Sequence, residues 1–244
     1  MKGIVCEEIG AFRLRDDLPE PSAGPGEAVV RIRRVGICGT DMHAFKGNQP
    51  YFTYPRILGH ELAGTIEWIG GNEGGLREGD QVAVIPYLHC GTCVACRRGR
   101  TNCCVNIRVL GVHTDGGMRE RIAVPVTHLV KTDGLTLDQT AVLEPLAIGA
   151  HAVRRSGAGA GETALVIGAG PIGLGVAAFA KFAGARVIAM DLSDDRLAFC
   201  RSWAGADHAV NASDEPVKRI AELTDGDFPT IVFDATGSAR SMMD

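Results

Sequence analysis

The chain changes its pattern of hydrophobic and polar positions near residue 150. Before that point, short segments alternate apolar and polar residues and are rich in β-branched side chains, which is typical of strands with one buried face. Clusters of Gly, Pro and Asn/Asp separate these segments, as turns do in an all-β domain. The segments that we predict as strands are Ala28–Val35, Gly64–Ile69, Gln81–Ile85 and Arg121–Val126.

From about Glu162 the pattern alternates short buried strands with helices. The predicted strands are Thr163–Ile167, Arg186–Asp191, His208–Asn211 and Pro229–Ala235, and the predicted helices are Pro171–Ala183, Asp194–Trp203 and Glu215–Leu223. Strands that alternate with helices at this spacing indicate a parallel, doubly wound sheet. We therefore predict an α/β protein with two domains, a β domain over residues 1–150 and the parallel sheet over residues 151–244.

The overall composition argues against several classes of partner. The net charge is −4 and the basic residues are scattered singly, so we expect neither a nucleic-acid nor a membrane-binding surface. The longest apolar stretch, Thr163–Ala183, is interrupted by several glycines, Pro171 and Lys181, which is incompatible with a membrane helix. Because the N-terminus has no export signal, we expect the cytoplasm, where the cysteines of such a chain bind metal more often than they form disulfides.

Four cysteines lie close together in Pro86–Asn106, in the pattern C-x2-C-x2-C-x7-C. Short spacers let successive thiolates turn onto one tetrahedral Zn²⁺, and four thiolates fill its coordination sphere, so such a site is structural. Cys103 and Cys104 are both possible as the fourth ligand, and an iron–sulfur cluster is the alternative to zinc. The predicted ligands are Cys90, Cys93 and Cys96, with Cys103 or Cys104 as the fourth.

A second group of metal-binding residue types is dispersed along the chain. Cys38 directly follows a predicted strand, His60 and Glu61 directly precede another, and Glu144 comes much later. A catalytic zinc takes three protein ligands and keeps one position for water or substrate, so this set has the right composition. The spacing alone identifies no site, because a single Cys after a strand is more often a core residue.

A glycine-rich turn follows the first strand of the second predicted domain. Gly168, Gly170 and Gly173 form Gly-x-Gly-x-x-Gly, with Pro171 and Ile172 opening the next helix. In such a turn the backbone approaches a pyrophosphate, and the helix N-terminus supplies free N–H groups for it.

The choice between the two dinucleotides depends on the end of the following strand. Asp191 lies there, roughly 20 residues after the turn, where a carboxylate binds the ribose 2′-hydroxyl and repels a 2′-phosphate. We therefore predict NAD, although Arg196 is placed where it could accept the 2′-phosphate of NADP.

These motifs together resemble the zinc-dependent medium-chain alcohol dehydrogenases. Val35–Asp41 with His43, then Gly59–Glu61, the four-cysteine lobe and the glycine-rich turn occur in the order and spacing of that family, over essentially the whole chain. The resemblance implies a GroES-like β-barrel catalytic domain, with a structural zinc lobe at residues 86–106, and a Rossmann NAD-binding domain. It also implies two Zn²⁺ per chain, one catalytic and one structural, Cys104 as the fourth ligand of the structural one, and a homo-oligomer, dimer or tetramer.

More particular features resemble one branch of that family. Glu61 and the Glu144–Leu146 segment resemble the polyol and threonine dehydrogenases, which have a carboxylate where ethanol-type enzymes have a third-ligand cysteine. The stretches Gly47–Arg56 and Gly99–Cys104 resemble bacterial sugar-acid dehydrogenases of the L-galactonate type.

The resemblance also implies roles for individual residues. Cys38 and His60 would bind the catalytic zinc, and Glu61 and Glu144 would bind it directly or through water. Thr40 would accept the alcohol proton and pass it through the nicotinamide ribose towards His43. Arg196 would lie against the adenine.

The expected activity is NAD-linked oxidation of a secondary alcohol on a sugar acid or polyol. Alternatives are a threonine- or sorbitol-type dehydrogenase, and an inactive zinc-binding or dimerising protein. A quinone reductase of the same superfamily is disfavoured, because those enzymes lack the cysteine lobe and Gly-His-Glu. Since the residues end at Asp244, we expect only part of the six-stranded Rossmann sheet, which puts hydride transfer by these residues alone in question.

Overall fold

The computed structural model describes residues 1–71 and 75–242 and divides the chain into two compact units, Met1–Glu144 and Pro145–Asp244. The sequence pattern placed this change at residues 150 and 151. Among the described residues, no helix is long and apolar enough to cross a membrane.

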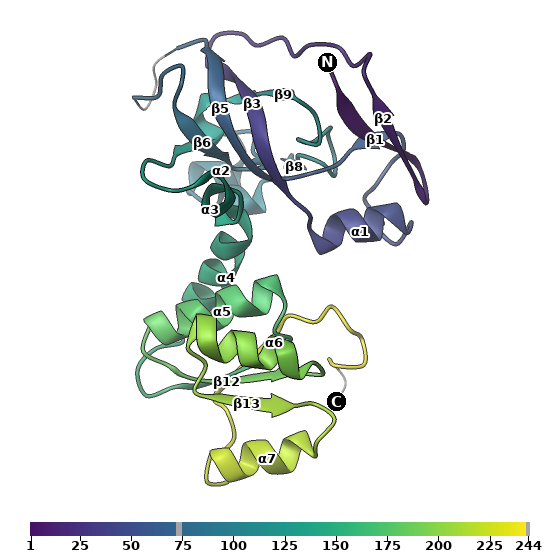
Figure 1. The fold of residues 1–244 in the computed structure, drawn as a ribbon. Helices are drawn as coiled ribbons and strands as arrows, with labels where there is room; N and C mark the ends of the chain where they lie inside the picture. The colour runs from purple at the N-terminus through teal and green to yellow at the C-terminus, as the bar shows by residue number, and fades with distance from the viewer. Residues whose placement is uncertain (72–74, 243–244) are drawn as a thin grey trace. The chain divides into compact units, whose positions relative to one another are not determined.

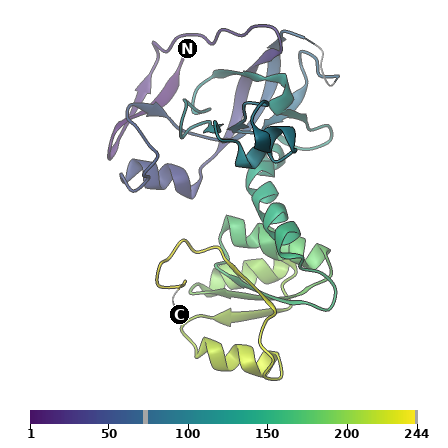
Figure 2. The same ribbon diagram turned by 180° about the vertical axis from the view of Figure 1, so that it is seen from behind.

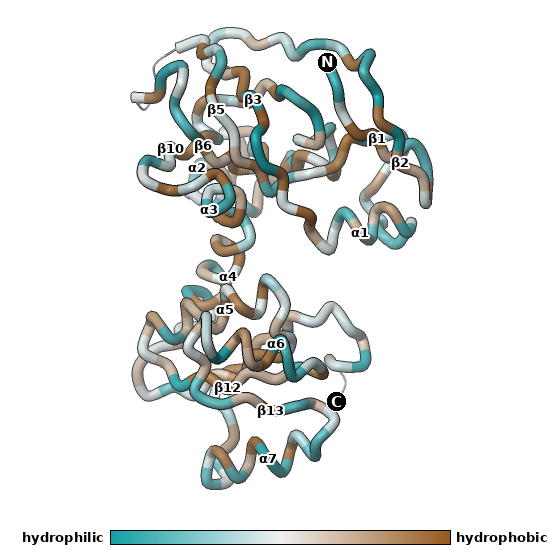
Figure 3. Tube along the Cα trace, in the orientation of Figure 1, coloured by the Kyte–Doolittle hydropathy of each residue, from teal (hydrophilic) through white to brown (hydrophobic). Residues whose placement is uncertain are grey.

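The first unit is built around a five-stranded antiparallel sheet (Figure 1). Its order is β10-β6-β5-β3-β9, and the strands are β3 (Glu27–Gly36), β5 (Glu61–Ile69), β6 (Gln81–Val84), β9 (Arg121–Pro125) and β10 (Leu129–Lys131). Four of them are the strands that the alternating pattern predicts. Their inward residues form the core, in which Val30, Leu62, Val82 and Ile122 are almost completely buried. The hydrophobic segments of β3, β5 and β6 lie together in Figure 3.

Smaller elements surround this sheet. They are the three-stranded sheet of β1 (Gly3–Glu8), β2 (Ala11–Arg15) and β4 (Arg56–Ile57), the pair β7 (Tyr87–Leu88) and β8 (Arg108–Val109), the α-helices α1 (Gly39–Phe45), α2 (Val94–Arg97) and α3 (Leu137–Ala141), and the 3-10 turns η1 (Thr101–Cys103) and η2 (Val126–His128). The sequence pattern did not predict these helices, because each is too short to show a helical period. Helix α4 (Leu143–Ser156) also begins within the region expected to be all β, so Glu144 lies in its first turn.

The second unit is the predicted parallel sheet with its helices (Figures 1 and 2). The strand order is β13-β12-β11-β14, and the elements are β11 (Thr163–Ile167), α5 (Pro171–Phe182), β12 (Arg186–Asp191), α6 (Asp194–Phe199), β13 (His208–Asn211), α7 (Pro216–Leu223) and β14 (Ile231–Asp234). One predicted helix is divided: α6 ends at Phe199 and continues as a π-helical turn (η3, Cys200–Ala204) before Gly205, at φ +73°.

Helices α4 and α5 come into close contact where Gly149 of α4 faces Gly175 of α5. A Cβ added to Gly149 would lie 2.7 Å from the carbonyl carbon of Gly175 and 2.8 Å from the nitrogen of Val176. Both of these atoms are backbone and cannot rotate away. The two helices therefore pack backbone against backbone at this point, and a methyl group would separate them.

We predict that Gly149→Ala lowers the free energy of unfolding by about 1–3 kcal/mol, because overpacking outweighs the better helix propensity of alanine. The measurement is urea or thermal unfolding followed by circular dichroism. Gly159→Ala is the matched control, since its nearest atom would be an ordinary contact at 3.7 Å. If both variants unfolded at the wild-type midpoint, the proposed backbone contact would be wrong.

Candidate functional site

The structure brings the four predicted cysteine ligands together in the lobe between β7 and β8. The sulfur atoms of Cys90, Cys93, Cys96 and Cys104 all lie within 4.8 Å of one another. Cys103 is exposed and is not part of this group. Backbone N–H groups point at the sulfurs: Cys96 N–H donates to Cys93 Sγ at 3.5 Å, and Cys90 N–H donates to Cys104 Sγ at 3.3 Å. Such bonds stabilise thiolates.

The chemistry of this cysteine group fits a divalent cation. Hydrogen bonds from the backbone and side chain of Thr92 lower the pKa of Cys90 to about 5. Burial, and next the hydrogen bond to the sulfur of Cys93, raise the pKa of Cys96 to about 12. Four thiols packed this closely therefore do not all ionise by themselves, and a bound cation is what allows it. A closed set of four thiolates is suited to a structural zinc.

The pairing of β3 with β5 assembles the second group. Gly36, the last residue of β3, pairs with Glu61, the first residue of β5. Cys38 follows β3 by two residues and caps α1, while His60 directly precedes β5. The ligand atoms of Cys38, His60 and Glu61 consequently lie within 4.8 Å of one another, although the residues are far apart in sequence. His60 is 6 % exposed and Glu61 is 9 % exposed.

Gly36 leaves the space that the Glu61 side chain occupies. A Cβ at position 36 would lie 2.0 Å from Glu61 Oε2 and 2.8 Å from Glu61 Cβ. The Glu61 side chain therefore lies across the backbone of the neighbouring strand. This explains the glycine at the end of β3.

Asp41 joins the two segments that carry these ligands, and the sequence analysis did not assign it a role. Its buried carboxylate accepts hydrogen bonds from the N–H of Cys38 at 2.9 Å and from the N–H of Gly59 at 3.3 Å. Its Oδ1 also lies 3.9 Å from His60 Nδ1. The sequence signal was an acidic residue three positions after Cys38, where a capping residue of a helix start is expected.

The charges of this centre also favour a cation. Burial opposes protonation of His60, but Cys38, Asp41 and Glu144 together raise its pKa to about 9. Burial and the charge of Glu144 raise the pKa of Glu61. One thiol, one imidazole and one carboxylate form a set of three ligands that fits a zinc ion with a free position.

Glu144 is held beside this centre by a tyrosine that the sequence analysis missed. Tyr87 Oη donates a hydrogen bond of 2.5 Å to Glu144 Oε1. Burial and the hydrogen bond to Glu144 raise the pKa of Tyr87, so the phenol keeps its proton. Glu144 is not in the group whose ligand atoms lie within 4.8 Å. No feature of the sequence around Tyr87 indicated this contact.

Thr40 and His43 lie on α1, which starts directly after Cys38. They are three positions apart, so they occupy the same face of the helix. Thr40 is half-buried and His43 is exposed. This pair therefore runs from the segment that carries Cys38 towards solvent.

The glycine-rich turn lies in the second unit, between β11 and α5. Gly168 has a φ of +94°, which favours glycine, and a Cβ on Gly173 would lie 1.7 Å from the carbonyl oxygen of Gly168. A Cβ on Gly170 would meet no atom within 4 Å, so the backbone here faces open space. Gly170 caps α5 without a side-chain hydrogen bond, and Pro171 and Ile172 form the first turn. These features fit the binding of a pyrophosphate.

Asp191 lies at the end of β12 beside this turn. Its Oδ2 accepts from the N–H of Ala169 at 2.7 Å, and its Oδ1 accepts from the N–H of Ser193 at 2.9 Å. Arg196 is largely exposed, with Nη1 at 4.0 Å from Asp191 Oδ2. These two hydrogen bonds hold the carboxylate in one orientation beside the glycine-rich turn.

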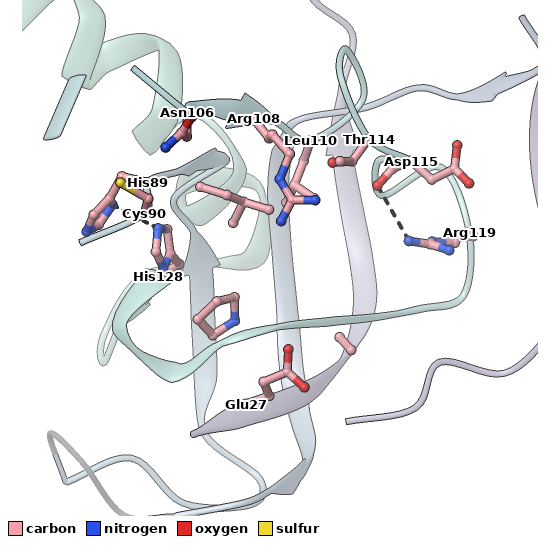
Figure 4. Close-up of a pocket in the computed structure, with 13 residues that line it drawn as sticks. Glu27, His89, Cys90, Asn106, Arg108, Leu110, Thr114, Asp115, Arg119 and His128 are labelled. Carbon is pink, nitrogen blue, oxygen red and sulfur yellow. Dashed lines mark hydrogen bonds between the residues drawn. The ribbon is translucent and has the colours of Figure 1, made fainter. Parts of the chain in front are cut away.

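A separate cavity of about 520 Å³ lies next to the cysteine lobe in the first unit (Figure 4). Among the residues that line it are His89, Cys90, Arg108, Arg119 and His128. His128 Nε2 lies 3.1 Å from His89 Nδ1. The cavity is not lined by Cys38, His60 or Glu61, so it is distinct from the second metal-binding group.

Two family profiles match the chain, one described as an alcohol dehydrogenase GroES-like domain (residues 24–134) and one as a zinc-binding dehydrogenase (residues 171–244). L-galactonate-5-dehydrogenase of Escherichia coli K12 is 46% identical over 243 residues, which are 99% of this chain and 71% of that protein. L-threonine 3-dehydrogenase of Pyrococcus horikoshii is 36% identical, over 96% of this chain and 68% of that protein.

Solved structures of dehydrogenases also match the chain. The crystal structure of a protein described as a short chain alcohol dehydrogenase (rspB) from Escherichia coli CFT073, complexed with NADH, matches with a TM-score of 0.88 and 35% identity. The match covers 98% of this chain and 70% of that chain. The predicted combination of a GroES-like domain and a Rossmann-type sheet is thereby confirmed.

We predict that Gly36→Ala displaces the Glu61 carboxylate and lowers the zinc content by up to one ion per chain, because the new methyl group would overlap Glu61 Oε2. The measurement is zinc per chain by mass spectrometry after dialysis against a weak chelator. Gly39→Ala is the control, since a Cβ there would meet nothing within 4 Å. Equal zinc contents in the two variants would refute the steric argument.

The cysteine lobe allows a second, paired test. Cys104→Ser should lose one zinc per chain and unfold at a lower temperature, because the lobe then has only three thiolates. Cys103→Ser should keep the wild-type zinc content and melting temperature, since Cys103 is exposed and outside the group. The reverse result would assign the fourth ligand to Cys103.

Proposed function

The chain belongs to the zinc-binding alcohol dehydrogenase family, and on this premise we propose that it oxidises a secondary alcohol of a sugar acid or polyol with NAD. The observation that carries the proposal is the convergence of Cys38, His60 and Glu61 on one point. Three ligands leave a coordination position for substrate, whereas the four-cysteine lobe leaves none.

The residues around this point have distinct roles in the proposed reaction. Cys38, His60 and Glu61 would hold a zinc ion, whose Lewis acidity would lower the pKa of a bound alcohol. Thr40 accepts the alcohol proton, and His43, one helical turn further along α1, releases it to solvent. Asp41 keeps Cys38 and the Gly59–His60 backbone in register throughout.

The second unit binds the hydride acceptor. The turn from Gly168 to Gly173 and the first turn of α5 bind the pyrophosphate, and Asp191 binds the adenosine ribose. The reaction would balance with a hydride passing from the alcohol carbon to NAD⁺ and the hydroxyl proton passing to Thr40, while Thr40 gives its own proton on through the nicotinamide ribose towards His43 and solvent. The products are a ketone, NADH and one proton.

The substrate class rests on the relatives. The relative at 46% identity is named L-galactonate-5-dehydrogenase, so a hydroxyl of a six-carbon sugar acid is the first substrate to test. A threonine-type activity is the second candidate. The L-threonine 3-dehydrogenase of Pyrococcus horikoshii, at 36% identity, matches 96% of this chain. Both substrates are secondary alcohols on a molecule that bears a carboxylate.

We predict that Cys38→Ser loses one of two zinc ions and lowers NADH formation at least about 1,000-fold, since several kcal/mol of Lewis-acid stabilisation are removed. The assay follows NADH absorbance with L-galactonate, D-sorbitol and L-threonine, alongside zinc content and circular dichroism. Cys103→Ser is the control and should retain both zinc ions. Zinc binding without NADH formation from any substrate by the wild-type chain would favour the inactive zinc-binding alternative.

The nucleotide preference is tested separately. Asp191→Asn should lower the preference for NAD over NADP at least about tenfold, because the repulsion of a 2′-phosphate disappears while the side-chain shape remains. The measurement is the ratio of the two dissociation constants by fluorescence titration. Asp195→Asn removes the same charge from an exposed position of α6 and should leave the ratio unchanged. An unchanged ratio in Asp191→Asn would remove the argument for NAD.

A further inference from the structure

The cavity beside the cysteine lobe is not used by the proposed function. It lies within the first unit, and its volume of about 520 Å³ is in the range of sites for small molecules (Figure 4). Its walls come from three segments: the lobe with His89 and Arg108, the loop before β9 with Thr114 and Arg119, and η2 with His128. A ligand that filled this cavity would link the three segments.

The two arginines that line this cavity have few partners. Within residues 1–71 and 75–242, neither Arg108 nor Arg119 forms an ion pair, and their side chains make a single hydrogen bond between them. It is a long one, 3.5 Å, from Arg119 Nη2 to the carbonyl oxygen of Asp115. Arg119 Nε and Thr114 Oγ1 are buried without any partner. Because buried polar groups in this condition are costly and rare, they favour a ligand that accepts hydrogen bonds here.

The charge at this end of the cavity is positive. Burial lowers the pKa of Arg119, and the charge of Asp115 opposes this only in part. Asp115 contributes one negative charge, but Arg56 already pairs with it at 3.4 Å. Glu27, the other carboxylate on the wall, lies at the opposite end of the cavity from Arg108 in Figure 4. Arg108 and Arg119 therefore line the cavity without a counter-charge, and an anion would supply it.

The rest of the wall indicates what the anionic group is attached to. The imidazoles of His89 and His128 and the amide of Asn106 can form hydrogen bonds with hydroxyl groups. Among the described residues, the wall contains no Phe, Tyr or Trp on which the base of a nucleotide could stack. A hydroxylated body, as in a sugar derivative, fits this lining better than a nucleotide does.

We propose that this cavity binds a small hydroxylated anion, a sugar phosphate or a sugar acid, whose phosphate or carboxylate group is bound by Arg108, Thr114 and Arg119. A planar guanidinium suits both groups, because it can donate two parallel hydrogen bonds to either. The site is separate from the second metal-binding group and does not rest on the proposed function. Arg108 belongs to β8, at the edge of the lobe, and Arg119 precedes β9, so the ligand connects the lobe to the main sheet.

The test measures binding of D-glucose 6-phosphate and of D-gluconate by isothermal titration calorimetry, with D-glucose as the neutral compound. At least one of the anions should bind and D-glucose should not, and the comparison of the two anions decides between phosphate and carboxylate. Hydrogen–deuterium exchange should slow in residues 108–119 when the anion is added. Arg119→Gln should weaken binding at least about tenfold, because a charged donor is lost.

Two further variants make the result specific. Thr114→Val replaces a hydroxyl without a partner by a methyl group of similar size, so it should keep the fold and weaken binding about threefold or more. Arg100→Gln is the matched control: it removes the same charge from an exposed position of the lobe that does not line the cavity, and it should bind as the wild type does. Circular dichroism checks the fold of each variant.

Three results would overturn the proposal. The first is that neither anion binds to the wild-type chain. The second is that an anion binds equally well to the wild type, Arg119→Gln and Thr114→Val. The third is that exchange slows in the glycine-rich turn, residues 168–173, and not in residues 108–119, which would place the anion at the nucleotide site. None of these results bears on the metal centre, so the proposed function is tested separately.

Discussion

The register between β3 and β5 is the constraint on which the candidate metal centre depends. It places Gly36 opposite Glu61, with Cys38 and His60 just beyond the paired residues. A slip of one residue would turn the Glu61 side chain to the other face of the sheet. The pairing contains an irregularity between Ile32 and Arg34, which shifts the register before the last three pairs. Irregularities of this kind commonly re-aim side chains at functional sites.

The cysteine lobe is held by a different principle. It has little core of its own, since of its four clustered cysteines only Cys104 is buried, and its short helix and 3-10 turn contain no buried residue. Closely packed thiols with opposite pKa shifts would need a cation to become equivalent ligands, so a bound ion would supply folding free energy that apolar burial does not.

The second unit depends on small residues and close backbone contact. Alanines such as Ala164, Ala177 and Ala180 are completely buried in its core, so the helix packs closely on the sheet. Small residues also form the glycine-rich turn. Gly173 lies against the Gly168 carbonyl oxygen, and Gly170 faces open space. The absence of a side chain at Gly173 is therefore a packing requirement.

The sequence by itself determined the features that are local. These are the strands with alternating residues, the strand–turn–helix around Gly168–Gly173, and the four cysteines, whose short spacers allow one ion to bind all of them. Only the tertiary structure decided which distant residues meet. It brought Glu61 rather than Glu144 to Cys38 and His60, and it placed Tyr87, which no spacing indicated, against Glu144. The physical reason is that strand pairing and side-chain hydrogen bonds join residues whose separation in sequence carries no period or motif.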